Sequence, residues 1–249
     1  MKKAFLLLAG VIMLVSLACS FNVNLPEINI NKTLEGSGTM ITQERIVSGF
    51  DSVELRGFGD LTITQGSSES LTIEAEDNII DKLTSEVVKN KLILSTVDDF
   101  TFKSLKGVHY TLTVIDLKRV DLTGLGSIEM DGLNTQRLKI NESGSGNLTI
   151  HNLDAQSLDI EIGGLGSVEL DGKAPDQVIT ISGAGNYSGY ELKSDRTKVT
   201  INGLGNALVW ATESLNVKIS GTGNVEYYGD PQLTESITGL GRVKPKGSH

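Results

Sequence analysis

A pair of glycines separated by one residue recurs seven times between residues 124 and 241, and this repeat constrains the fold most strongly. The first glycines of successive pairs are 18 to 20 residues apart, at positions 124, 144, 164, 183, 203, 221 and 239. Glycine accounts for 28 of the 249 residues, which is high for a globular chain. An internal period of this length is typical of solenoids, propellers and other repeat architectures.

Short stretches of alternating apolar and polar residues flank each glycine pair. Aliphatic side chains stand two and four positions before the first glycine of most pairs, as at Ile179 and Ile181. They stand again four and six positions after it, as at Leu148 and Ile150. Because such alternation is typical of half-buried strands, each repeat is predicted to contain a strand, a glycine corner, a second strand and a loop.

Coils of about 20 residues, stacked at the ~4.8 Å spacing of neighbouring strands, form a β-solenoid. Glycine suits its tight corners because it has no side chain and adopts positive φ. An antiparallel sandwich is the alternative, but hairpins would not keep seven glycine pairs in the same phase. Residues 67–95 are less regular: a helical turn is expected within 77–83, and a strand pair or coil edge around 89–91.

The N-terminus has the features of an export signal. Met1-Lys2-Lys3 precedes a 12-residue apolar run, Ala4 to Val15, which is too short to span a ~30 Å hydrocarbon layer comfortably. Ala18 then precedes the only cysteine, Cys19, in an arrangement that resembles a bacterial lipobox. We therefore expect a lipoprotein signal peptide over residues 1–18, membrane attachment through a lipid on Cys19, and a tether over residues 19–44.

Composition argues against several classes of site. Lys and Arg number 22 against 31 Asp and Glu, a net charge of −9 that disfavours nucleic-acid binding. A single cysteine excludes a disulfide framework and a cysteine metal cage. None of the glycine pairs completes the dinucleotide motif Gly-x-Gly-x-x-Gly. Val168 stands where a calcium-binding nonapeptide repeat would need aspartate, so neither a metal nor a cofactor is expected.

One predicted outward column, seven residues beyond the first glycine of each pair, carries the candidate site residues Asp131, His151, Asp171, Tyr190, Trp210 and Tyr228. Stacking would place the two aspartates about 9–10 Å apart, a separation that also suits inverting glycoside hydrolysis. The three aromatic residues would form a flat apolar strip that suits sugar rings or a protein partner. If the register slipped by one residue, this strip would instead turn inward and pack in the core.

A second polar column follows each glycine pair directly. Its members, all serine or asparagine, are Ser127, Asn147, Ser167, Asn186, Asn206 and Asn224. Stacked amide side chains can hydrogen-bond from coil to coil, so this column is predicted to stabilise the solenoid.

Three segments together with the glycine repeat resemble the bacterial head GIN domain family. They are residues 45–53 (RIVSGFDSV), 57–66 (GFGDLTITQG) and 71–78 (LTIEAEDN). The resemblance implies a right-handed parallel β-helix over residues 45–246 and an exported, often lipid-anchored protein. Members of the family carry the label of auto-transporter adhesin and have no established activity, so the resemblance implies an envelope role without defining one.

These observations favour a non-catalytic lipoprotein that faces outside the cytoplasm and binds a glycan or an envelope protein, or serves as a structural module. One alternative is a polysaccharide-cleaving lyase or glycoside hydrolase that uses Asp131, Asp171 or Glu169. Another is a homo-oligomeric envelope scaffold. The carboxylates are predicted to lie on an open face, where nothing would separate their pKa values for acid–base work, and this favours the non-catalytic interpretation.

Overall fold

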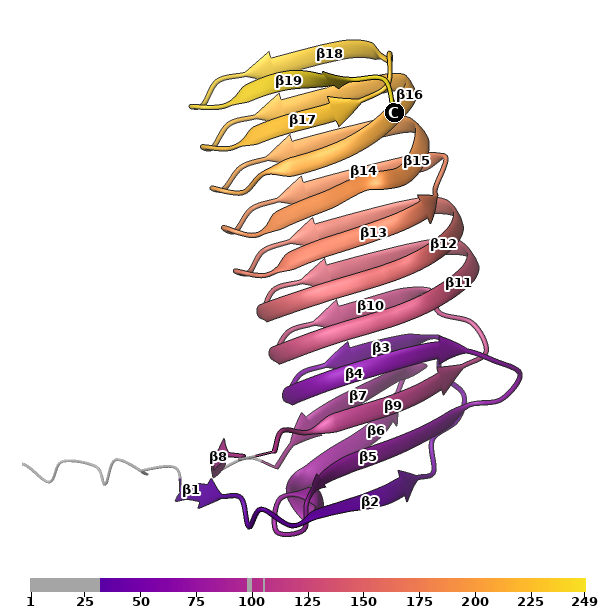
Figure 1. Ribbon diagram of the computed structural model, residues 1–249, viewed down its shortest axis with the longest axis vertical. Coiled ribbons are helices and arrows are strands. Elements are labelled where there is room, and N and C mark those ends of the chain that lie inside the picture. The colour runs from indigo at the N-terminus through magenta and orange to yellow at the C-terminus, as the bar shows by residue number, and fades with distance from the viewer. Residues whose placement is uncertain (1–31, 98–99, 105) are drawn as a thin grey trace, which may run out of the picture. The chain divides into compact units, whose positions relative to one another are not determined.

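The computed structural model describes residues 32–97, 100–104 and 106–249 (Figure 1). These residues form strands and one short 3₁₀ helix, η1 (Ile80–Lys82). The strands are β1 (Lys32–Glu35), β2 (Met40–Arg45), β3 (Ser52–Leu55), β4 (Phe58–Gln65), β5 (Ser70–Glu76), β6 (Leu83–Val88), β7 (Lys91–Thr96), β8 (Phe100–Lys103), β9 (His109–Val114), β10 (Arg119–Leu122), β11 (Leu125–Glu142), β12 (Ser145–Ile162), β13 (Ser167–Lys173), β14 (Asp176–Ile181), β15 (Asn186–Ile201), β16 (Ala207–Ile219), β17 (Asn224–Tyr228), β18 (Gln232–Ile237) and β19 (Arg242–Gly247).

The strands stack as the coils of a β-solenoid, with two parallel faces (Figure 1). The first face contains β9, β4, the first part of β11 and β12, then β13, the first part of β15 and β16, β17 and β19. The second face contains β7, β3, β10, the second part of β11 and β12, then β14, the second part of β15 and β16, and β18. The predicted solenoid is therefore confirmed.

Neighbouring coils keep the register that the glycine repeat predicts. β11 and β12 pair from Leu125 opposite Ser145 to Glu142 opposite Ile162, an offset of 20 residues throughout. Because the offset is constant, inward side chains of one coil stack on inward side chains of the next. Ile128, for example, lies opposite Leu148, and both are buried.

The space between the two faces is filled by these stacked aliphatic side chains. A few polar side chains share this inward register: Gln177 and Thr197 are buried in line with Leu158 and Leu215. Glu142 carries an ionisable group there: it lies in line with Leu122 on one side and Ile162 on the other, and is fully buried. Burial raises the pKa of Glu142, while the backbone N–H groups of the corner glycines Gly166, Gly164 and Gly144 act in the opposite direction.

The glycine corners approach one another too closely to admit a side chain. A Cβ atom built on Gly146 would lie 1.7 Å from the carbonyl oxygen of Gly126, and one on Gly223 would lie 2.0 Å from that of Gly205. Positive φ is not the general reason for these glycines, because among the seven pairs only Gly126 has it, at 143°. Close stacking of the corners requires glycine instead.

The N-terminal end departs from simple stacking. After β4 the chain forms β5 to β9 on one side of the β3–β4 coil and then returns as β10 on the other side. The end is closed by antiparallel pairing of β2 with β5, β5 with β9, and β6 with β7. Lys89 and Asn90, both at positive φ, make the β6–β7 turn, so the irregular segment contains the expected helical turn and a strand pair.

The described solenoid unit begins before residue 45. Residues 40–44, which the sequence assigns to the tether, lie in β2 and pair with β5. Glu76 at the end of β5 is buried and accepts hydrogen bonds from Gly38 N at 2.8 Å and Ser104 Oγ at 2.6 Å. The Gly36-Ser-Gly38 corner is thereby tied to the first coils. Cys19 and the signal segment 1–18 lie outside the described residues.

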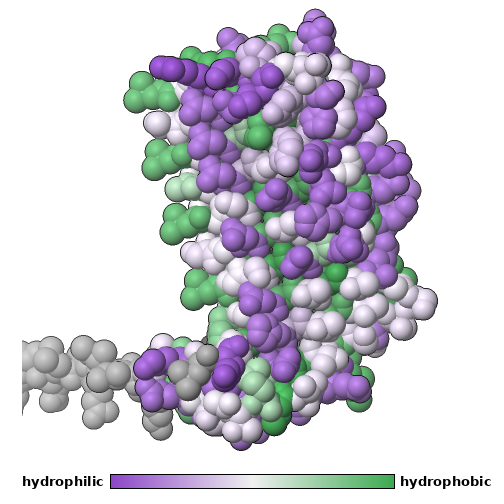
Figure 2. Space-filling view, in the orientation of Figure 1, coloured by the Kyte–Doolittle hydropathy of each residue, from purple (hydrophilic) through white to green (hydrophobic). Residues whose placement is uncertain are grey.

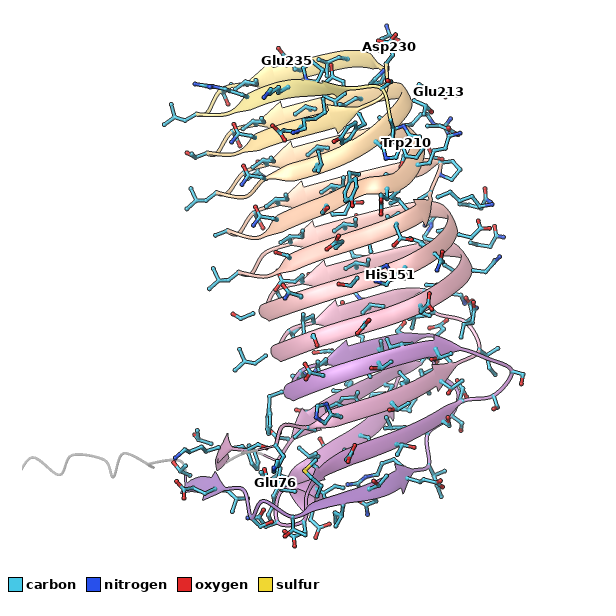
Figure 3. All side chains as sticks on the ribbon, viewed as in Figure 1. Glu76, His151, Trp210, Glu213, Asp230 and Glu235 are labelled. Carbon is cyan, nitrogen blue, oxygen red and sulfur yellow. The ribbon has the colours of Figure 1, made fainter. Side chains whose placement is uncertain are left out.

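The C-terminal end is an open coil. β18 pairs with β16, and β19 pairs with β17, and within residues 32–249 as described neither has a partner on its other side. Glu235 lies in the inward register opposite Val217, and Pro245 lies opposite Tyr227; Figure 3 shows Glu235 at this end. A charge and a proline at inward positions discourage the addition of a further strand. In the described part of the chain there is no helix of the length and apolar character needed to cross a membrane.

Candidate functional site

The six residues of the predicted column, here called the acidic–aromatic column, follow the outward side of the first face. They are Asp131 on β11, His151 on β12, Asp171 on β13, Tyr190 on β15, Trp210 on β16 and Tyr228 on β17. The first five each follow a buried residue, and Tyr228 follows Tyr227, which is partly buried and packs against the core, so the strand alternation turns all six outward. His151 and Trp210 are labelled in Figure 3, with Trp210 nearer the C-terminal end.

The acidic half of the column is joined by hydrogen bonds. Asp131 lies in register opposite His151, and the Nδ1 atom of His151 is 2.6 Å from Oδ2 of Asp171. Asp171 thereby raises the pKa of His151, with smaller contributions from Asp131 and Glu129. His151 remains almost half exposed, so this interaction lies at the surface.

Asn152 completes this cluster. Its backbone N–H donates to Oδ1 of Asp171 at 2.7 Å, and its side-chain amide donates to Oδ1 of Asp131 at 2.9 Å. Asn152 adopts a left-handed φ of 52°, which asparagine tolerates better than most residues. Asp171 therefore uses both oxygens and Asp131 uses one to hold the strand end in place.

A polar groove opens beside this cluster at the corner where the first face ends. It is an open hollow of about 650 Å³, lined by Asp131, Asn134, Asn152, Asp154 and Gln65 among others. The Gln65 amide donates to the carbonyl oxygens of Ile115 and Asn134 at 3.1 Å, and it accepts from Asn134 N at 2.9 Å. Carboxylate and amide groups of this kind can bind hydroxyl groups of a ligand.

Sequence reasoning missed the groove residues Gln65, Asn134, Asn152 and Asp154. The sequence does mark the corner at which this groove lies, through the residue eight positions beyond the first glycine of a pair. Left-handed residues recur there in phase, at Gly132, Asn152, Gly172, Gly229 and Gly247. Glycine and asparagine are the residues that most readily adopt this conformation, so they mark the second corner of the coil.

The aromatic half of the column is only partly in register. Trp210 pairs directly with Tyr228, and both side chains are half-buried and outward. The ring of His249 stacks on Trp210, with centroids 4.0 Å apart and planes 10° apart, and meets the edge of Tyr228. A bulge in β15 places Lys193, rather than Tyr190, opposite Trp210, so Tyr190 does not continue the strip in register.

The polar column beside the glycine pairs forms the predicted ladder at its C-terminal end. Asn206 donates from both its backbone and its side-chain amide to Oδ1 of Asn186, at 3.2 and 3.0 Å. Asn224 donates in the same way to Oδ1 of Asn206, at 3.0 and 3.2 Å. The structural role predicted for these three residues is confirmed.

The acidic–aromatic column lies on an open sheet face. Three or more His, Cys, Asp or Glu side chains placed to hold a metal ion do not occur among the residues described. The aspartates of the column lie on an open sheet face and already accept hydrogen bonds from Asn152 and His151. The geometry therefore fits a binding surface better than an enclosed reaction centre.

Comparison with family models matches residues 49–231 to the model described as "Putative auto-transporter adhesin, head GIN domain". The chain belongs to the head GIN domain family. The resemblance seen in the sequence is thereby confirmed. The match to the head GIN model takes in the coils from the segment before β3 to the loop after β17, and so includes the whole acidic–aromatic column.

Solved structures share this head GIN fold. A "putative adhesin" from Bacteroides fragilis is 28% identical, with a TM-score of 0.82, and the alignment covers 85% of this chain and 99% of that one. A "putative lipid binding protein" from Parabacteroides distasonis is 20% identical, with a TM-score of 0.66 and coverage of 86% and 99%. A "putative adhesin" from Parabacteroides merdae is 17% identical, with a TM-score of 0.64 and the same coverage.

The two Parabacteroides structures establish the shared fold alone, because their sequence identity is low. Comparison with curated proteins gives no match. These three structures are named as putative adhesins and a putative lipid binding protein.

Proposed function

We propose that this head GIN protein is a non-catalytic adhesin of the bacterial cell envelope, and that it binds glycan through the acidic–aromatic column. The observation that carries the proposal is the in-register pair Trp210–Tyr228 on an outward sheet face. The polar groove and the His151–Asp171 pair lie on the same face, nearer the N-terminal end. The family description and the Bacteroides fragilis relative, both named as adhesins, support the adhesive role.

The two halves of the column offer complementary chemistry. An aromatic ring presents a flat apolar surface on which a sugar ring can stack, and an edge that remains polar. The His249 ring lies nearly parallel to Trp210, with ring centroids 4.0 Å apart, so the indole face accommodates a flat ring, and a sugar ring would take the place of His249 there. Carboxylate and amide oxygens further along the face would accept hydrogen bonds from sugar hydroxyls.

A glycan and envelope-polymer array tests this proposal. Residues 20–249 contain every described strand, so this soluble form carries the fold. We expect binding that is lost in Trp210→Ala while circular dichroism remains unchanged. Val178→Ala, an exposed apolar substitution on the second face, is the matched control and should bind like the parent. Equal binding by Trp210→Ala and the parent would exclude the column as the site.

Non-catalytic binding can be tested separately. A polysaccharide-cleaving enzyme would release reducing sugar from an acidic glycan, and the release would disappear in Asp131→Asn or Asp171→Asn. We expect no release from the parent protein, because neither carboxylate is enclosed. Release of reducing sugar that either substitution abolishes would show that the protein is a polysaccharide-cleaving enzyme and would contradict the non-catalytic proposal.

Attachment to the envelope is proposed to occur through a lipid on Cys19. The apolar run before it and the small residue Ala18 support this part of the proposal. Cys19→Ala should release the protein from the membrane fraction of cells, since no other lipid anchor is predicted. Unchanged retention of the variant would contradict the anchor.

A further inference from the structure

The middle residues of the seven glycine pairs alternate between large apolar and small side chains. In coil order they are Leu125, Ser145, Leu165, Ala184, Leu204, Thr222 and Leu240, here called the corner column. The four leucines are 61%, 73%, 67% and 83% exposed, far more than core residues of the same type. A regular row of exposed leucines is unusual enough to need an explanation.

Backbone hydrogen bonds hold the corner column in line. Leu165 N donates to the carbonyl oxygen of Gly144 at 3.2 Å, Ala184 N to that of Gly164 at 3.0 Å, and Leu204 N to that of Gly183 at 2.9 Å. The same bond recurs at each of the seven corners. Leucines therefore project every second coil, about 9.6 Å apart. Figure 2 shows separate hydrophobic side chains projecting in a row along one edge of the solenoid.

A hollow lies between Leu125 and Leu165 and extends to Ala184. The corners of four successive coils line an open hollow of about 450 Å³, with Leu125 and Leu165 on its wall and Ser145 and Ala184 between and beside them. This volume is many times the ~30 Å³ share of one water molecule, so a leucine side chain can enter.

The surface around the corner column is nearly free of charge. Counting the glycine pair, its middle residue and one neighbour on each side, the seven corners hold a single charged residue, Arg242, although 21% of the chain is charged. A protein with a net charge of −9 repels its own copies over most of its surface. This edge is where two copies can approach without like-charge contacts.

We propose that the corner column is an interface for a second copy of this chain, packed antiparallel so that Leu125, Leu165 and Leu204 of each copy face the small corners of the other. A two-fold axis between the coils of Leu165 and Ala184 places Leu165 opposite Ala184 of the partner subunit. The same axis places Leu125 opposite Thr222 of the partner subunit, and Ser145 opposite Leu204 of the partner subunit. A parallel pair at equal height would instead bring leucine against leucine, so the alternation selects the antiparallel pair.

The proposed interface is small. Seven corners at the strand spacing span about 29 Å, and a corner is about 10 Å wide, the separation of two packed sheets. The column alone therefore buries about 600 Å² over both copies, below the ~1,200–2,000 Å² of stable complexes. The dimer is a weak one, formed at high local concentration. It goes beyond the glycan-binding proposal, because it uses a corner of the coil and not the outward face.

Sedimentation velocity of residues 20–249 over a range of concentrations up to millimolar tests the dimer. We expect reversible self-association, with the dissociation constant raised about tenfold or more in Leu165→Ser/Leu204→Ser. Val178→Ser removes an exposed apolar side chain from the second face and should leave the dissociation constant unchanged. A parent protein that stays monomeric throughout would overturn the proposal.

The Ala184→Leu variant distinguishes interlocking of the leucines from unspecific apolar association. The substitution adds apolar surface at an exposed position, so an unspecific apolar patch would associate more tightly. Interlocking predicts the opposite, because the new side chain fills the hollow that receives Leu165 of the partner subunit. Tighter association of Ala184→Leu would therefore refute the proposed packing. Trp210→Ala should leave the association unchanged, so failure of glycan binding and failure of the dimer are distinguishable.

Discussion

Inside the solenoid, the side chain of Tyr187 lies over Gly189 of the same strand and fills the space that a side chain at position 189 would need. Tyr187 is 2% exposed, and a Cβ atom on Gly189 would lie 2.3 Å from its hydroxyl oxygen. Tyr187 also stacks on the small Ala207 of the next coil. The ring thus occupies volume that Gly189 and Ala207 leave free, and its hydroxyl group has no hydrogen-bond partner among the described residues.

Tyr187→Phe is expected to stabilise the protein. A buried hydroxyl without a partner costs about 1–3 kcal/mol, and phenylalanine removes it while keeping the ring. Urea denaturation should show a free energy of unfolding raised by about that amount. Tyr187→Ala, which leaves a cavity, should lower it by about 3–5 kcal/mol. A loss of stability in Tyr187→Phe would show that the hydroxyl is hydrogen-bonded after all.

Gly146→Ala should disrupt the stacking of coils. The new methyl group would lie 1.7 Å from the carbonyl oxygen of Gly126, an approach that only a backbone shift can relieve. We expect a loss of more than about 3 kcal/mol, in the range of severe core changes, measured by thermal and urea unfolding. Ser145→Ala, at the adjacent corner position, is the control and should change stability little. Equal stability of the two variants would contradict the close packing of corners.

Glu142→Leu should make the protein more stable at neutral pH. Leucine matches the aliphatic side chains above and below it and removes a buried charge, a gain of about 1–3 kcal/mol. Because burial raises the pKa of Glu142, the folded state binds this proton more tightly than the unfolded state. Its contribution to stability is therefore full below the unfolded pKa and is lost as pH rises through the folded pKa.

The pH dependence provides the check on Glu142. The advantage of the leucine variant should be largest at neutral pH and shrink as the pH falls toward the ordinary carboxyl pKa, 4.5. Unfolding free energies of both proteins, measured in steps from neutral to acidic pH, give this difference directly. An advantage independent of pH would mean that Glu142 does not carry the charge.

Asp171→Asn should lower the pKa of His151. In the native protein the Asp171 carboxylate, 2.6 Å from Nδ1, favours the imidazolium and raises the pKa above the ordinary 6.5. The stabilisation from this pair is complete below the unfolded pKa and is lost as pH rises through the raised value. Titration of the histidine ring signals by NMR should show the midpoint moving down in Asp171→Asn. An unchanged midpoint would mean that the pair does not persist in solution.

Much of the fold could be predicted because glycine spacing and strand alternation are periodic. Because side chains alternate along a strand, the residues two and four positions before a glycine pair face the same side, so Ile179 and Ile181 could be assigned to the core. The N-terminal coils could not be predicted in this way. β9 and β4 pair across 49 residues of sequence, from Asp60 opposite His109, and no period connects them.

The positions of the site residues could be predicted where the repeat is regular, and the prediction failed where the repeat is irregular. Asp131 and His151 lie in coils of equal length, and their side-by-side position follows from the 20-residue offset. Tyr190 precedes an irregular turn, where a bulge moves Lys193 opposite Trp210. Bulges depend on local backbone geometry more than on composition, so the sequence alone did not reveal this shift.

The constant offset between β11 and β12 also bears on how such a chain can evolve. Parallel pairing of the same kind continues on the next coil, so duplication of a 20-residue unit in the gene would insert a coil that pairs as its neighbours do. Each insertion would carry the C-terminal coil about 4.8 Å further from the N-terminal cap. The length of the solenoid can thus be adjusted in uniform steps, separately from the chemistry of its outward face.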